Sequence, residues 1–524
     1  MKNSFASRAA LALGLLLLPG VALAGPAAEG LSCLHRADLV CAQERVVEAR
    51  EEEGEAAITL LLEAELAFHE GRFAEAASFI SEAAQRSGEL TPKQQKGLPE
   101  QRVLYLGTAE VTAGMVETRV DDVIVLHHPG IERILVDDAV DAIQRARMRI
   151  APRLGGDLPY PVRVELYPDT ASFITASGLP QEAVATTGVV AISKYNRLIV
   201  SSPRALGRGY GWRDTIVHEW IHLVVSYHSK EQAPIWLQEG VAKSTDMLWR
   251  EDGYVLEVNK QGLLAGALDS GRFVTFEEMH PSMAFLPSAE MAALAYAQVS
   301  TMMEYLQIRT DRQALARVIA QVGKGTDPMD AVAKVAGVGF DRFEADWKAW
   351  LGTLDLVGYK VASIPTVLGD DANDFDYDPV LSRRKDLANR ARLGDLMAAQ
   401  GHWEAALIYY GQAVPEDGPM PPHVAIASAR AHLELGNTVV AVGLLEQSVA
   451  DYPELAGNHK ALADLYRSEG RDRLALEHYR DSAEINPFDA EVQRALAELY
   501  ELTGQADLAR KHAAKVRVLL YQDT

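Results

Sequence analysis

Three ionisable residues stand close together in an otherwise apolar segment, TIVHEWIHLVV, at residues 215–225. His218 and His222 are four positions apart, so on a helix their imidazoles project from the same face. Two neutral imidazoles so placed suit a zinc ion. Glu219 would lean toward the open side of the ion, where it can take a proton from bound water. The pattern predicts zinc-dependent hydrolysis with Glu219 as general base; the alternative is a helix whose histidines only pack or hydrogen-bond.

A catalytic zinc ion needs a third protein ligand, and the sequence offers two candidates. His228 has the spacing from His222 that metzincins use, but their chain turns at a glycine where Val225 stands here. A β-branched residue resists the left-handed conformation of such a turn. Glu239 lies inside a helix that Pro234 can start. The short connection SYHSKEQA would return this helix antiparallel to the first, with Glu239 facing the histidines.

These two segments together resemble the gluzincin metallopeptidases, and most closely the peptidase MA-like group, which pairs H-E-x-x-H with W-L-x-E-G-x-A. The second motif is complete here, with Trp236, Leu237, Glu239, Gly240 and Ala242. The resemblance covers residues 118–355. It implies an α+β zincin-like domain with a mixed N-terminal sheet and a helical C-terminal half. It also implies one zinc ion per chain, held by His218, His222 and Glu239, and hydrolysis of peptide bonds.

Two further positions carry a functional and a structural interpretation. The resemblance implies that Tyr296, in ALAYAQVSTMMEYL, helps to hold the charged oxygen of the transition state. Its alternative is a core tyrosine on an amphipathic helix. Asp246 returns to the helical face of Glu239 and could steady a ligand histidine. Its alternative is a carboxylate on the helix surface.

The resemblance also implies an edge strand along which an extended peptide would lie, using backbone hydrogen bonds. The segment GVVAISKYNRLIVSS should supply it, with the contact at Gly188, Val189, Val190 and Ala191. Aminopeptidases of this class carry a glutamate on the equivalent strand for the free amine of the substrate. This strand has no acidic residue there, so exopeptidase activity is in question.

The elements that position these residues divide the chain into regions. Residues 31–90 are rich in Ala, Glu and Leu with helical periodicity. Residues 118–210 contain predicted strands and one predicted amphipathic helix. From there to about residue 355 the sequence predicts helices. The segment GDDANDFDYDP predicts an acidic linker over residues 356–380. The whole chain is therefore expected to be mostly α-helical.

A fixed period begins at residue 385 and runs to 519. Gly401, Gly436, Gly470 and Gly504 recur at intervals of 35, 34 and 34 residues, and an alanine follows each glycine after five positions. This resembles the tetratricopeptide repeat, a helix pair that needs a small residue where its helices cross. Residues 31–90 repeat the pattern once, at Gly71, Ala76, Ile80 and Ala83. Such repeats predict a concave surface for a protein partner or substrate.

Residues 1–24 combine Lys2 and Arg8 with a short apolar block and a small-residue cleavage site, which is typical of a secretory signal peptide. We expect an exported protein, periplasmic or extracellular, without a stable membrane span. The net charge of −22 makes nucleic acid an unfavourable partner. Cys33 and Cys41 either form a disulfide, which requires a turn between them, or remain two small buried thiols.

The predicted function is an exported zinc metallopeptidase whose repeats recruit a protein partner or substrate. A rival from another class is a tetratricopeptide interaction scaffold with an inactive zinc-binding domain. A third is a hydrolase of a non-peptide amide, which the same chemistry permits. The glutamate beside the first histidine favours the enzyme, because a purely structural zinc ion does not need a base.

Overall fold

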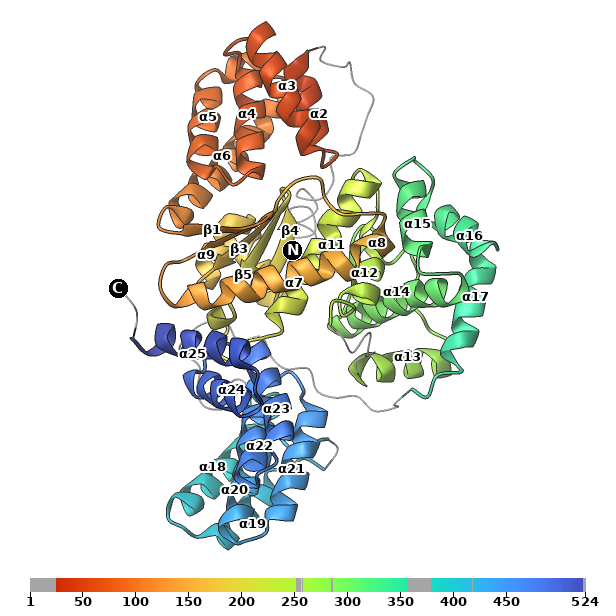
Figure 1. Cartoon of the computed structure of the whole chain (residues 1–524). Coiled ribbons are helices and arrows are strands. Elements are labelled where there is room, and N and C mark those ends of the chain that lie inside the picture. Colours follow the sequence, from red (N-terminus) through yellow and green to blue (C-terminus); the bar gives the residue numbers. More distant parts are fainter. Residues whose placement is uncertain are drawn as a thin grey trace.

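The structure is a computed structural model that describes residues 25–250, 256, 258–283, 286–356, 378–416 and 418–521. The predicted signal peptide, 1–24, and most of the predicted acidic linker lie outside the described residues. The chain is mostly helical, with one small sheet between an N-terminal group of helices and a larger helical part (Figure 1). A row of helical hairpins follows toward the C-terminus.

The N-terminal group contains five α-helices, and a disulfide joins the first two. Cys33 near the end of α2 is bonded to Cys41 near the start of α3, with their Cα atoms 5.8 Å apart. Ala37 in the intervening turn has a positive φ of 58°, so the chain reverses as a disulfide between these positions requires. The helices are α2 (Pro26–Leu34), α3 (Leu39–Glu52), α4 (Ala57–His69), α5 (Phe73–Gln85) and α6 (Pro92–Thr112).

The sheet has five strands in the order β1-β2-β3-β5-β4. The three central strands β2, β3 and β5 are parallel, and β1 and β4 add antiparallel edges. Tyr195 and Asn196 both have positive φ, as a tight two-residue hairpin between β4 and β5 requires. The strands are β1 (Val116–Val120), β2 (Val123–His127), β3 (Val162–Tyr167), β4 (Ala191–Lys194) and β5 (Arg197–Ser201).

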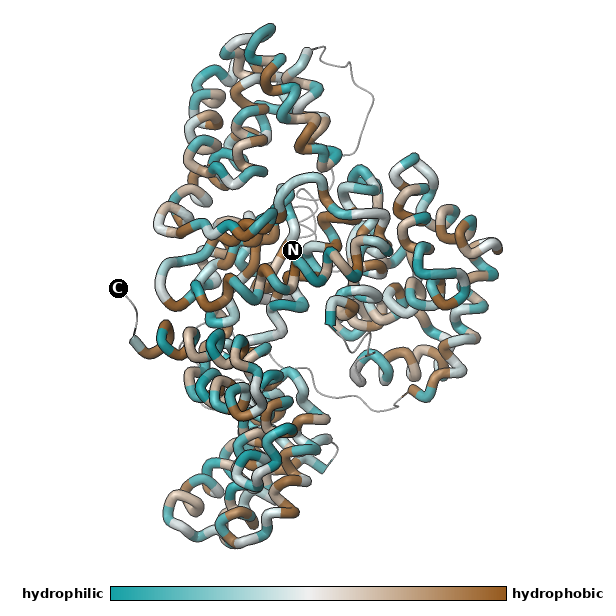
Figure 2. Tube along the Cα trace, in the orientation of Figure 1, coloured by the Kyte–Doolittle hydropathy of each residue, from teal (hydrophilic) through white to brown (hydrophobic). Residues whose placement is uncertain are grey.

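One face of the sheet packs on the helices that follow it. Residues Val162, Val164 and Leu166 of β3 join the main hydrophobic core, together with α7 (Val136–Arg149) and α11 (Trp212–Ser229). Strand residues alternate between faces, so every second position of β3 reaches this core. Figure 2 shows hydrophobic residues in the sheet and along the helices around it. The core therefore fixes α11 against the sheet.

The opposite face of the sheet carries buried charges, which the N-terminal helices cover. Glu165 accepts hydrogen bonds from Arg163 at 2.9 Å and from Arg197 at 2.8 Å. The Arg197 guanidinium lies 4.3 Å from the ring centroid of Phe68 on α4 and 4.8 Å from that of Phe73 on α5. These cation–π contacts attach the N-terminal helices to the sheet.

The larger helical part holds the rest of the main core. Its long helix α14 packs closely against α12, and the aromatic helix α17 closes the core with Phe343 and Trp347. The helices after the sheet are α12 (Ile235–Thr245), α13 (Val258–Ser270), α14 (Ala289–Arg309), α15 (Ala314–Val322), α16 (Pro328–Ala336) and α17 (Phe340–Leu351). Shorter elements before α11 are η3 (Ile131–Leu135), α8 (Ala151–Leu154), α9 (Thr170–Ser177), α10 (Gln181–Thr187) and η4 (Pro203–Ala205).

The periodic glycines separate the two helices of each C-terminal hairpin. Gly401, Gly436, Gly470 and Gly504 all have φ between 72° and 79°, a conformation that favours glycine. The alanines five positions later are buried at each helix crossing. The pairs are α18 (Lys385–Ala399) with α19 (Trp403–Gln412), α20 (Pro422–Glu434) with α21 (Thr438–Asp451), α22 (Ala456–Ser468) with α23 (Asp472–Ile485), and α24 (Ala490–Leu502) with α25 (Ala506–Tyr521).

The hairpins are docked on the central part of the chain by polar contacts. Arg213 of α11 donates to Glu484 of α23 at 2.5 Å, and the Tyr210 amide donates to the Ile485 carbonyl at 3.0 Å. Asp138 of α7 forms ion pairs with Lys511 and Lys515 of α25. Figure 1 shows α25 beside the sheet-bearing part. Among the described residues, no helix is long and apolar enough to cross a bilayer.

Candidate active site

Helices α11 and α12 carry the two sequence motifs. His218 and His222 lie one turn apart on α11, and both are 9% exposed. Lys230 at the end of α11 adopts the left-handed conformation with φ 53°, and Pro234 then starts α12. This reversal brings Glu239 of α12 to the two histidines. The predicted meeting of residues from separate helices is therefore present in the structure.

The three side chains converge on one point. The Nε2 atoms of His218 and His222 are 3.1 Å apart. The Glu239 carboxylate oxygens lie 3.4 Å from His218 Nε2 and 3.7 Å from His222 Nε2. One donor atom from each residue lies within 4.8 Å of the others. Two imidazole nitrogens and a carboxylate oxygen are a donor set that suits zinc.

Asp246 lies behind the first histidine. Its Oδ2 atom is 3.0 Å from His218 Nδ1, and the side chain is buried rather than on the helix surface. Lys243 donates to the same carboxylate oxygen at 3.2 Å. The contact holds the His218 ring with Nε2 turned toward Glu239, which is how a carboxylate orients a metal-binding histidine. His222 Nδ1 has no such hydrogen-bond partner among the described residues.

The charges around His218 favour a cation at this place. Burial lowers the pKa of His218 and Lys243 acts in the same direction, but hydrogen bonds to Asp246 and Glu239 outweigh both and raise it to about 9. Burial raises the pKa of Glu239, yet the two histidines overcome it and bring it to about 2. Burial lowers the pKa of His222. The two carboxylates thus stabilise positive charge among the imidazoles.

Glu219 is held by the edge of the sheet. The backbone amide of Ser193 on β4 donates to Glu219 Oε2 at 2.7 Å. Glu219 is 9% exposed and follows His218 directly on α11. This backbone donor ties the carboxylate of Glu219 to the edge strand. Ser193 is a site residue that the sequence analysis missed, because a backbone contact between distant segments leaves no signal in side-chain types.

Tyr296 on α14 lies near the same group. Burial raises the pKa of its phenol, and the negative charges of Glu239 and Glu219 act in the same direction. Gly240, next to Glu239 on α12, lies against α14. A Cβ at Gly240 would lie 2.9 Å from the Val299 carbonyl oxygen of α14. The glycine of the second motif therefore allows the close packing of α12 and α14.

The predicted substrate strand begins later than expected. Gly188 has φ 66° and ends α10 in the left-handed conformation, so it is not a strand residue. The β4 strand begins at Ala191, and Val190 contributes only a carbonyl that accepts from the Ser201 amide at 2.8 Å. The prediction of Gly188, Val189 and Val190 as strand residues is wrong. The edge nearest Glu219 is Ala191–Lys194.

His228, the alternative third ligand, lies elsewhere. Its Nε2 atom is 3.2 Å from the Gly156 carbonyl oxygen, and the residue does not belong to the converging group.

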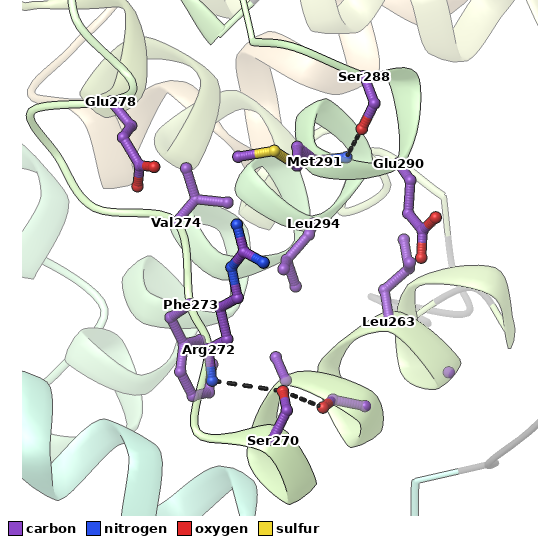
Figure 3. Close-up of a pocket in the computed structure, with 13 residues that line it drawn as sticks. Leu263, Ser270, Arg272, Phe273, Val274, Glu278, Ser288, Glu290, Met291 and Leu294 are labelled. Atoms are coloured by element: carbon purple, nitrogen blue, oxygen red, sulfur yellow. Dashed lines mark hydrogen bonds between the residues drawn. The ribbon is translucent and has the colours of Figure 1, made fainter.

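A separate cavity of about 360 Å³ lies between α13 and the start of α14 (Figure 3). Arg272, Leu294 and Glu290 are among its lining residues, whereas the histidines and Glu239 are not. The cavity is therefore distinct from the candidate site.

Comparison with known families identifies the central part of the chain. Residues 142–353 match the model of the Peptidase MA superfamily. This segment contains α11, α12 and α14, and with them all the side chains brought together above. A peptidase-type domain therefore occupies the middle of the chain.

Similar solved structures correspond to about a quarter of the chain. A MamA structure has 20% identity and a TM-score of 0.23 over 26% of this chain and 80% of that chain. A MamA fragment from Desulfovibrio magneticus RS-1 has 18% identity and a TM-score of 0.24, covering 27% and 80%. YrrB, titled a TPR protein with an unusual peptide-binding site, has 17% identity and a TM-score of 0.24, covering 27% and 72%. No curated protein matches the chain.

Proposed function

We propose that this chain is a zinc metallopeptidase in which His218, His222 and Glu239 hold one zinc ion. The observation that carries the proposal is the convergence of these three donors beside Glu219, whose carboxylate lies at the edge of the sheet. The match of this segment to the Peptidase MA superfamily supports it. When bound, zinc supplies Lewis acidity and makes water a nucleophile near neutral pH.

The protein side chains supply orientation and proton transfer. Asp246 accepts from His218 Nδ1 and so leaves Nε2 for the ion. Glu219 takes the proton of the attacking water and passes it to the departing amine. Tyr296 donates a hydrogen bond to the oxygen that becomes charged on the peptide carbonyl. The β4 edge, Ala191–Lys194, offers backbone groups to an extended peptide.

Export and recruitment complete the proposal. The disulfide between Cys33 and Cys41 supports export, since disulfides persist in oxidising compartments. We place the protein in the periplasm or the extracellular medium. The hairpins from α18 to α25 would recruit a protein partner or present a protein substrate to the catalytic centre.

Replacing the general base tests the mechanism. Glu219→Gln should keep zinc, because Glu219 is not a proposed ligand, and should lower peptide hydrolysis by about 10²–10⁴-fold. Zinc content is measured by mass spectrometry of the metal, and cleavage with a diverse peptide library. Glu110→Gln on α6 is the matched control, since Glu110 is exposed and distant in sequence from the site. Its activity should equal that of the wild type.

Two outcomes would contradict the proposal in different ways. Undiminished hydrolysis by Glu219→Gln would remove Glu219 from its role as base. Stoichiometric zinc in the wild type, without cleavage of any peptide in the library, would favour the interaction scaffold instead. In that case the repeats would be the functional part of the chain.

A further inference from the structure

A second group of metal-binding side chains lies in the repeats. His459 of α22 and His478 and Asp481 of α23 each offer a ligand atom, and these atoms lie within 4.8 Å of one another. None of the three belongs to the Peptidase MA segment. We propose that they form a second site for a divalent transition metal ion such as zinc, independent of the catalytic centre.

The spacing of the donor atoms fits an ion between them. The Nδ1 atoms of His459 and His478 are 3.2 Å apart. Asp481 Oδ2 lies 3.5 Å from His459 Nδ1 and 3.9 Å from His478 Nδ1. Ligands on a tetrahedral zinc ion with bonds of about 2.0–2.1 Å are roughly 3.3 Å apart. The carboxylate is too far from either ring for a good hydrogen bond but close enough to share a cation with both.

A backbone carbonyl orients the buried histidine for this role. His459 Nε2 is 2.8 Å from the carbonyl oxygen of Pro453, which can only accept a hydrogen bond. The ring must therefore donate from Nε2, and its lone pair lies on Nδ1, the atom that faces His478 and Asp481. A ligand histidine commonly donates its second ring nitrogen to a backbone carbonyl in this way. His459 is 5% exposed, so its ring has little freedom to turn.

The other two ligands provide access to the ion. The Asp481 side chain is 53% exposed and that of His478 is 21% exposed. An ion can therefore enter from solvent, and water can fill its remaining coordination position. Imidazole and carboxylate together suit zinc, and copper or nickel would compete for such a set.

The site would connect two helices at the place where the repeats are docked. It joins α22 to α23, and Glu484 lies one turn beyond Asp481 on α23. Glu484 pairs with Arg213 and Arg250 of the peptidase-type part. A metal that binds only the folded hairpin stabilises it by mass action. The ion would therefore strengthen the hairpin that contacts the catalytic helix α11.

Metal counting on the full chain tests the proposal. The protein is stripped with a chelator, titrated with zinc chloride alone and analysed for bound metal. Wild type should bind two ions, and His459→Gln with His478→Gln should bind one. The double variant His218→Ala and His222→Ala should also bind one, so the two sites are counted separately. His402→Gln on the repeats, an exposed histidine outside the group, is the control and should keep two.

A milder variant guards against misfolding. Asp481→Asn preserves side-chain size at an exposed position and should weaken the second zinc equivalent by at least 10-fold, with the first unchanged. Cobalt(II) titration of His218→Ala with His222→Ala should give a visible absorption spectrum that is lost when His459 and His478 are also replaced. A folded His459→Gln, His478→Gln protein that binds as much zinc as the wild type overturns the proposal.

Discussion

At the scale of single residues, the contact between Asp246 and His218 orients a proposed metal ligand. The carboxylate touches neither substrate nor ion in the proposed mechanism. It accepts from His218 Nδ1 at 3.0 Å and is itself bound by Lys243. Because a carboxylate partner fixes the ring and raises the basicity of the ligand nitrogen, its effect should be seen in metal affinity.

Asp246→Ala should lower zinc affinity by about 10–100-fold, the usual effect of losing such a partner. Competition with a chromophoric chelator measures it. Asp269→Ala on α13 removes an exposed carboxylate from a neighbouring helix and should leave the affinity unchanged. Equal affinities for Asp246→Ala and wild type would mean that the contact with His218 is only structural.

The residues of the candidate site differ in how far the sequence reveals them. His218, Glu219 and His222 follow from helical spacing alone, because their geometry is local. Glu239 requires the fold to bring a second helix back, and the motif around it was needed to select it over His228. The contact of the Ser193 amide with Glu219 depends on tertiary packing, so side-chain types could not reveal it.

At the scale of elements, the crossing of α12 and α14 sets the relation between Glu239 and Tyr296. A Cβ at Gly240 would lie 2.9 Å from the Val299 carbonyl oxygen and 3.0 Å from Met303 Cγ. The carbonyl belongs to the α14 backbone and cannot turn away like a flexible side chain. A larger residue must therefore push the two helices apart.

Gly240→Ala should lower the free energy of unfolding by about 1–3 kcal/mol through overpacking. Peptide hydrolysis should fall as well, because Tyr296 moves with α14. Denaturant unfolding and peptide cleavage measure the two effects. Gly266→Ala on α13 is the matched control, since nothing lies within 4 Å of its added Cβ. In a helix this change should stabilise by about 0.5–1 kcal/mol. A Gly240→Ala protein as stable as the Gly266→Ala protein would contradict the argument.

The elements themselves were predicted unevenly from the sequence. The repeat period of the sequence predicts the helical hairpins, because its recurring glycines mark helix ends. In the structure each of these glycines has a positive φ. Helix α6 was not predicted, since Gly97, Pro99 and Gly107 are residues that usually interrupt helices. The apolar run GVVA favours a strand, so the sequence predicts a start of β4 that is too early. The left-handed conformation of Gly188 is set by the end of α10.

At the scale of the whole molecule, His69 is buried in the N-terminal helices and His512 is half-buried in the C-terminal repeats. Burial and the charge of Arg197 lower the pKa of His69 to about 3, where α4 meets the sheet at Asn196. Burial and the charge of Lys515 lower the pKa of His512 to about 3 on α25. Both rings are neutral in the folded chain at neutral pH. In the unfolded chain each takes up a proton near pH 6.5.

Stability should therefore fall as the pH falls from 6.5 toward 3, because the unfolded chain then binds protons that the folded chain excludes. Each histidine contributes about 1.4 kcal/mol per pH unit in this range, or about 2 kcal/mol between pH 6.5 and 5. Urea unfolding at pH 7 and pH 5 measures the loss. His69→Gln with His512→Gln should show a smaller loss than wild type; an equal loss would assign the acid sensitivity to other groups.

The docking of the repeats through Arg213, Tyr210 and Asp138 also bears on selectivity. Because the hairpins contact the central part of the chain through both α23 and α25, they cannot move freely around the proposed catalytic centre. A protein substrate bound to the repeats would therefore be held at a fixed distance and orientation from the proposed catalytic centre. The cleavage sites in that substrate would then depend on their distance from the segment bound to the repeats, as well as on the amino acids that flank the cleaved bond.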